Sequence, residues 1–93
     1  MEKLVTILEQ FPLSARPYTA KDGTPMVFNL RGFLLTDGID EFYAEMTGDA
    51  ALACPDYDRN MLHKVQACIK TRTYTDKNGA TRYENQVVIM KLV

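Results

Sequence analysis

The chain has 93 residues, of which 46% are apolar and 25% are charged, as in an ordinary globular domain. No apolar run approaches the roughly 20 residues that span a bilayer. The start does not resemble a signal peptide, because Glu2, Lys3 and Glu9 interrupt its apolar residues. We therefore expect one cytoplasmic domain over residues 1–93, with no membrane segment.

The net charge is −1, but the charged residues are distributed unevenly along the chain. Residues 1–63 carry 5 basic and 10 acidic side chains, whereas residues 64–93 carry 6 basic and 2 acidic ones. The potential over one part of the surface can therefore differ in sign from the total. The C-terminal third suits an anionic ligand. The acidic stretch from Asp37 to Asp58 would keep that ligand off another face or attract a basic partner.

The N-terminal part predicts two strands separated by irregular structure. Lys3–Phe11 also fits helical spacing, but its β-branched residues and the proline that follows favour a strand. Residues 12–23 contain two prolines and an Asp-Gly turn signal, and we expect them to be irregular. Thr24–Thr36 predicts a long strand, in which Gly32 marks a bulge or a sharp bend.

The middle of the chain predicts a third strand and a little helix. Asp40–Thr47 alternates apolar and polar residues, which indicates a strand. Residues 49–62 are the only plausible helical region, and Pro55 divides it. We expect one short turn before Pro55 and another over Asp58–Leu62.

The C-terminal part predicts a long hairpin. Lys64–Thr75 and Ala80–Val93 are the fourth and fifth strands, joined by a three-residue loop that ends in a left-handed Gly79. One register gives a continuous apolar face, and a slip of one residue would destroy it. That register pairs Ile69 with Val87, Ala67 with Ile89, Arg72 with Glu84, Tyr74 with Arg82, and Lys70 with Gln86.

This order of elements predicts an all-β fold: a five-stranded OB-fold Greek-key barrel with a short helical segment between strands 3 and 4. Each strand has an apolar side that can face a small closed interior. The residues expected in this core are Phe28, Leu30, Phe42, Met46, Val65, Ala67, Ile69, Val87 and Ile89.

The hairpin resembles that of a known family. The run from Arg72 to Glu84, RTYTDKNGATRYE, is similar to the fourth-to-fifth strand hairpin of bacterial single-stranded DNA-binding proteins. That family has the pattern basic-Thr-basic-aromatic-x-Asp-x-x-Gly-x-x-Arg-Tyr. The segment from Phe42 to Ala50 resembles the family's aromatic third strand, but Thr47-Gly48-Asp49 replaces its Phe-Gly-Lys and the chain has no tryptophan. The resemblance implies a shortened, divergent relative with an OB-fold.

The hairpin's composition and the resemblance together imply a face that binds single-stranded DNA or RNA without sequence preference. Cations would neutralise phosphates, and aromatic rings would stack on bases. The expected cations are Arg31, Lys64, Lys70, Arg72, Lys77 and Arg82. The expected stacking residues are Phe33, Tyr43, Tyr74 and Tyr83.

Other interpretations of the same residues stay open. Half-exposed strands often carry Lys, Arg, Thr and Tyr without binding any ligand. The domain could also be a protein-interaction module in replication or mobile-element transfer. Pairing of strand edges predicts a homodimer or homotetramer. Cys54, Cys68 and the single histidine show no metal-ligand spacing, and we expect no metal, no cofactor and no catalytic site.

Overall fold

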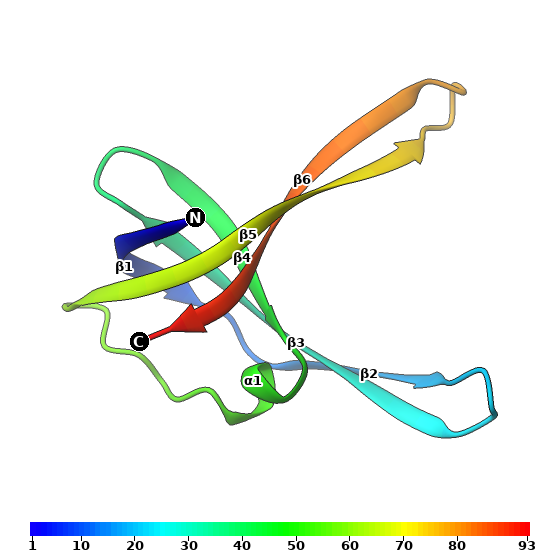
Figure 1. The fold of residues 1–93 in the computed structure, drawn as a ribbon, viewed down its shortest axis with the longest axis horizontal. Coiled ribbons are helices and arrows are strands. Elements are labelled where there is room, and N and C mark those ends of the chain that lie inside the picture. The colour runs from blue at the N-terminus through cyan, green and yellow to red at the C-terminus, as the bar shows by residue number, and fades with distance from the viewer.

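Six strands and one short helix make up the protein, and a computed structural model describes all residues from 1 to 93 (Figure 1). In chain order the elements are β1 Glu2–Gln10, β2 Ser14–Thr19, β3 Pro25–Thr36, β4 Glu41–Thr47, α1 Gly48–Ala53, β5 Leu62–Thr75 and β6 Thr81–Leu92. The one helix spans 6 residues, so no helix here has the length needed to cross a membrane.

Five of the six strands pair in a closed ring. β1 is antiparallel to both β3 and β5, β3 is antiparallel to β4, and β5 is antiparallel to β6. A short parallel pairing of β4 with β6 completes the ring. This is the order expected of the five strands of an OB-fold, with the helix between the third and fourth ring strands. The sixth strand, β2, pairs only with β3 and lies outside the ring.

The extra strand β2 corrects the expectation of irregular structure over residues 12–23. Ser14–Thr19 pairs with the first half of β3 in an unbroken antiparallel register. Pro17 is tolerated there because β2 is the last strand of the sheet, where one edge needs no hydrogen-bond donors. The second turn expected, over Asp58–Leu62, is present as a single hydrogen-bonded turn in which Met61 N–H donates to the Asp58 carbonyl at 3.4 Å, and it does not extend into a helix.

Gly32 does not form the expected bulge. β3 and β4 stay in register from the Leu30–Thr47 pair to the Thr36–Glu41 pair. Side chains therefore keep alternating through Gly32. Phe33 points into the ring, and Phe28 points to the outer face, where it is 41% exposed. The expectation that Phe28 is a core residue is wrong for this reason.

The core fills the inside of the ring and extends to the helix. It consists of Val5, Ile7, Phe33, Leu35, Ala44, Met46, Ala51, Val65, Ala67, Ile89 and Leu92. Four of the expected core residues belong to this set, and Leu30, Phe42 and Val87 are half-buried. Ile69 is 57% exposed, because β5 has left the ring at that point. Its expected place in the core is therefore wrong.

Two hairpins project from the ring as two-stranded ribbons (Figure 1). The first arm, residues 14–29, consists of β2 and the start of β3, and its strands pair only with each other. The second arm, residues 70–86, consists of the end of β5 and the start of β6. All five residue pairs expected between β5 and β6 are present, three of them within this arm, and Gly79 has the expected left-handed φ of 80°. The register prediction for this hairpin is confirmed.

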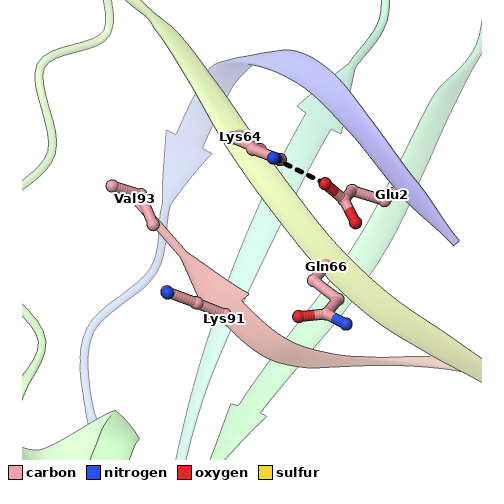
Figure 2. A pocket seen from close by; sticks show the side chains of 5 residues that line it. All are labelled: Glu2, Lys64, Gln66, Lys91 and Val93. Atoms are coloured by element: carbon pink, nitrogen blue, oxygen red, sulfur yellow. Dashed lines mark ion pairs between the residues drawn. The ribbon is translucent and has the colours of Figure 1, made fainter.

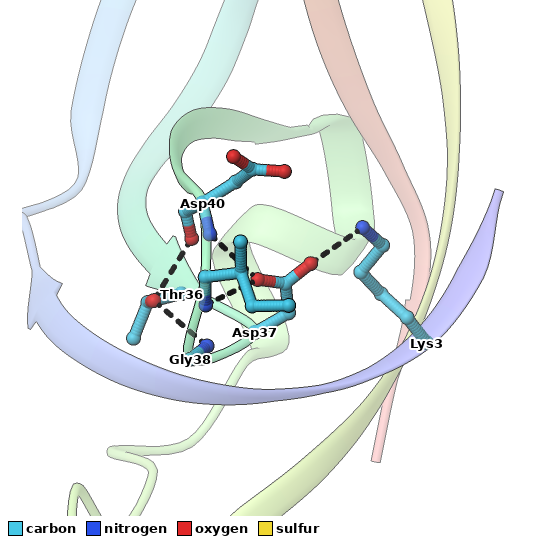
Figure 3. Close-up of polar contacts among 6 residues, drawn as sticks. Lys3, Thr36, Asp37, Gly38 and Asp40 are labelled. Carbon is cyan, nitrogen blue, oxygen red and sulfur yellow. Dashed lines mark hydrogen bonds and ion pairs between the residues drawn. The ribbon is translucent and has the colours of Figure 1, made fainter.

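A salt bridge fastens the β3–β4 turn to β1 (Figure 3). Lys3 Nζ donates to Asp37 Oδ2 at 2.9 Å, and the backbone N–H groups of Ile39 and Asp40 donate to Asp37 Oδ1. The backbone bond from Asp40, followed by the bond from Lys3, holds the pKa of Asp37 well below its usual range. The charged carboxylate is therefore the form that stabilises the fold.

The contribution of the Asp37 carboxylate to stability should depend on pH. Because its pKa is depressed in the folded state, its stabilisation is present above the unfolded value of about 3.9 and is lost as the pH falls toward the folded value. We expect Asp37→Asn to lower the melting temperature at neutral pH and to flatten the loss of stability below about pH 4. Thermal unfolding followed by circular dichroism measures both effects. Asp56→Asn, at an exposed site, is the control, and identical curves for wild type and Asp37→Asn would contradict the role.

Candidate nucleic-acid interface

One outer face of the sheet runs from the first arm across β4 to the second arm, and it is hollowed between the arms. The hollow has a volume of about 530 Å³ and is hereafter named the cleft. Its lining residues come from both arms and from the ring strands between them. They are Ser14, Arg16, Phe28, Leu30, Tyr43, Glu45, Thr47, Arg72, Gln86 and Val88.

Each arm contributes one guanidinium to the cleft. Arg16 comes from the first arm and Arg72 from the second, and neither forms an ion pair. Arg72 faces Glu84 in the strand register, but its guanidinium lies instead 5.6 Å from the centre of the Tyr74 ring. A cation with no carboxylate partner is free to bind phosphate. The cleft thus has one available cation on each wall.

An aromatic ring forms part of the cleft floor. Tyr43 of β4 is 49% exposed, and its ring crosses β3 at Gly32. A Cβ atom at Gly32 would lie only 2.7 Å from Tyr43 Cε2, so the ring can occupy this place only because Gly32 has no side chain. Phe11 packs edge-on against the same ring, with 6.0 Å between ring centres. Tyr43 is therefore a positioned, partly exposed aromatic surface.

The hydroxyl of Tyr43 points toward a neighbouring acid. Its oxygen lies 3.5 Å from Glu45 Oε2, which is a long and weak hydrogen bond. Burial, followed by the negative charge of Glu45, raises the pKa of Tyr43 above its usual value. The phenol therefore stays protonated near neutral pH and acts as a hydrogen-bond donor.

The structure brings five of the expected site residues to one face. Tyr43 and Arg72 line the cleft itself. Alternation along the second arm puts Lys70, Tyr74 and Arg82 on the same side as Arg72. Arg82 already pairs with Asp76 in the turn at 2.8 Å, so it is the least available cation of the group.

The other expected site residues lie elsewhere. Phe33 has no exposed surface and belongs to the core, so it cannot stack on a ligand. Arg31 lies on the same inner side of β3 as Phe33, and its Nη1 donates a hydrogen bond to Cys54 Sγ at 3.4 Å. Tyr83 projects from the opposite side of the second arm, and Lys77 lies in the exposed turn at its tip.

Lys64 lies in the ring portion of β5, away from both arms. It pairs with Glu2 at 2.6 Å, beside a small hollow of about 110 Å³ that Gln66, Lys91 and Val93 also line (Figure 2). Its charge is therefore matched within the protein. This places Lys64 outside the cleft.

The first arm carries cleft residues that sequence reasoning missed. Arg16 and Phe28 line the cleft, and Tyr18 lies on the same side of the arm, opposite Met26. The available signal was an Asp-Gly turn flanked by two alternating segments, which is typical of a hairpin. Pro17 weakened this hairpin signal, because a proline argues against a strand except at a sheet edge.

Comparisons with known proteins agree with this architecture. The chain is similar to the second OB-fold domain of replication protein A from Methanococcus maripaludis, whose structure was determined by solution NMR. The TM-score is 0.62 at 13% sequence identity, and the match covers 99% of this chain and 79% of that one. No protein-family model and no curated protein sequence matches the chain. At this level of identity the likeness shows the fold, and the fold is an OB-fold.

Proposed function

We propose that this OB-fold binds single-stranded nucleic acid, and DNA in particular, in the cleft between its two arms, without catalysing a reaction. The observation that carries the proposal is the arrangement of Arg16 and Arg72 on opposite walls around the exposed Tyr43 ring. The guanidinium groups neutralise phosphates, and the ring stacks on a base. The similarity to a domain of a replication protein supports the same interpretation.

The geometry fits a single strand better than a duplex. Stacking on Tyr43 requires a base whose face is free, and a duplex keeps its base faces stacked on each other. Tyr74 and Phe28 are further exposed rings on the cleft side of the two arms. Every base has a flat face, so stacking on such rings tolerates most sequences.

A titration of labelled oligo-dT followed by fluorescence anisotropy tests the proposal. Binding should weaken as salt rises, with a slope of log K against log salt of about −0.7 for each phosphate neutralised. A duplex of the same length is the control and should bind more weakly. An equal-length oligo-U tests the preference for DNA. No binding at low salt, or binding without a salt slope, would overturn the proposal.

Self-association is a further part of this proposal. Both edges of the second arm are unpaired, and Ile69, where the arm leaves the ring, is largely exposed. Pairing of such edges would cover apolar surface and extend the binding surface in a homodimer or homotetramer. Sedimentation velocity measures this directly, and a monomer at every concentration would contradict it.

The same free edges favour a second candidate function, that of a protein-interaction module in replication or mobile-element transfer. A partner strand could pair with either arm. The oligo-dT titration distinguishes the two functions, because a domain that only binds proteins would not bind oligo-dT at any salt concentration.

A further inference from the structure

The cleft contains one carboxylate among its cationic and aromatic side chains. Glu45 lies on the outer face of β4, between Tyr43 and Thr47. It also lines the neighbouring hollow between β4 and β6, so it lies where the two depressions meet. Tyr43 and Gln86 are shared by both depressions as well. Glu45 is therefore central to the face rather than at its rim.

No positive group neutralises this carboxylate. Glu45 forms no ion pair, although Arg72 lines the same cleft. Its one hydrogen-bond partner is the Tyr43 hydroxyl, at the long distance of 3.5 Å. An ionised carboxylate offers about four acceptor positions, so most of its capacity is unused. In a groove for a polyanion, such a charge repels phosphates and weakens binding unless a donor on the ligand reaches it.

The neighbouring ring indicates which part of the ligand would reach Glu45. The hydroxyl end of the Tyr43 ring points to Glu45, at 3.5 Å, so a base that stacks on the ring and extends past the hydroxyl would bring its edge within reach of this carboxylate. Arg16 and Arg72, which line the same cleft, would remain for the phosphates. A carboxylate only accepts hydrogen bonds, so of the two DNA pyrimidines it favours cytosine, whose N4 amino group donates. Thymine has a carbonyl oxygen, O4, at the same position, where two acceptors repel each other, and only its N3–H is left to donate, so it is disfavoured.

We propose that Glu45 makes the cleft prefer cytosine to thymine at the position that stacks on Tyr43. This inference rests on the proposed single-strand function and adds one selective position to an otherwise sequence-tolerant surface. Gln86, which carries both a donor and an acceptor, adds no comparable selection of its own.

The test compares oligo-dC with oligo-dT of equal length at mildly basic pH, where oligo-dC does not fold on itself. The quantity measured is the ratio of the dT dissociation constant to the dC dissociation constant. Glu45→Gln keeps the side-chain size but presents a donor as well as an acceptor. We expect the ratio to fall about fivefold or more in this variant, which corresponds to the removal of one good hydrogen bond to a base edge. Affinity for oligo-dT should rise, because a repulsive charge has gone.

Glu41→Gln is the matched control. Glu41 lies on the same face of β4 but does not line the cleft, so its replacement removes one charge without changing the ratio. An unchanged ratio in Glu45→Gln, with both oligonucleotides still bound, would overturn the base preference and leave the proposed function intact. An equal change of the ratio in Glu41→Gln would also overturn it. Failure of the wild type to bind either oligonucleotide at low salt would overturn the proposed function as well.

Discussion

Replacement of Phe33 by alanine is expected to lower the free energy of unfolding by about 3–5 kcal/mol. Phe33 has no exposed surface and is the largest fully buried side chain. It packs edge-on against Tyr57, with 6.0 Å between ring centres, and its removal leaves a cavity that the closed ring cannot easily fill. Urea denaturation at equilibrium measures the change.

Tyr43→Ala is the matched comparison, because Tyr43 lies on the adjoining strand with its ring half-exposed. We expect this variant to stay folded and to lose about 1–3 kcal/mol of binding free energy for each base that stacks on the ring. Phe33→Ala should therefore change mainly the free energy of unfolding, and Tyr43→Ala mainly the free energy of binding. A small change in stability for Phe33→Ala would contradict its place in the core, and unchanged binding by Tyr43→Ala would contradict the stacking role.

Substitution of Arg72 by alanine should weaken binding to single strands by about tenfold at low salt, which is typical when one hydrogen bond to a charged group is removed. Phosphate contacts carry no base information, so the effect should be similar for oligo-dT and oligo-dC. The salt slope should become shallower by about 0.7, because one phosphate fewer is neutralised. Titrations at several salt concentrations give both quantities.

Arg16→Ala should behave in the same way, because Arg16 lines the opposite wall. The two residues lie on separate arms, and the effects on binding free energy should add in the double variant. Lys64→Ala is the control, since its charge is paired with Glu2 outside the cleft. If Lys64→Ala weakened binding as much as Arg72→Ala, the cleft would not be the binding face.

The second arm could be predicted from sequence because several local signals agree there. Asn78-Gly79 marks the turn, and Gly79 adopts the expected left-handed conformation. The apolar residues Ala67, Ile69 and Val87 admit only one register. Turn chemistry and side-chain alternation are both short-range properties. A single sequence therefore determines the pairing.

The side of β3 that faces the core could not be predicted in the same way. The sequence prediction placed Phe28 and Leu30 in the core and Phe33 on the binding face, but the strand alternates without a bulge and with the opposite side facing inward. Gly32 instead provides space for the Tyr43 ring, which comes from another strand. Such a role depends on a tertiary contact, and a glycine that accommodates a distant ring looks the same in sequence as one that bends a strand.

Burial on the arms could not be predicted from alternation either. Ile69 continues the apolar pattern of Val65 and Ala67, but β5 has left the ring at that position. Likewise, Phe28 and Leu30 alternate correctly, yet on the face that lines the cleft. Alternation identifies which residues share a face. It does not say whether another layer covers that face.

The two arms also make the width of the cleft easy to change. Each arm is a ribbon of two strands, and a hairpin of that kind is only marginally stable alone in water. Bending or fraying of an arm breaks none of the pairings that close the ring, so its free-energy cost is far below that of global unfolding. If the cleft binds single strands as proposed, its width can change to fit purines or pyrimidines while the core keeps its structure. Loss of this motion on binding would appear as an unfavourable conformational entropy.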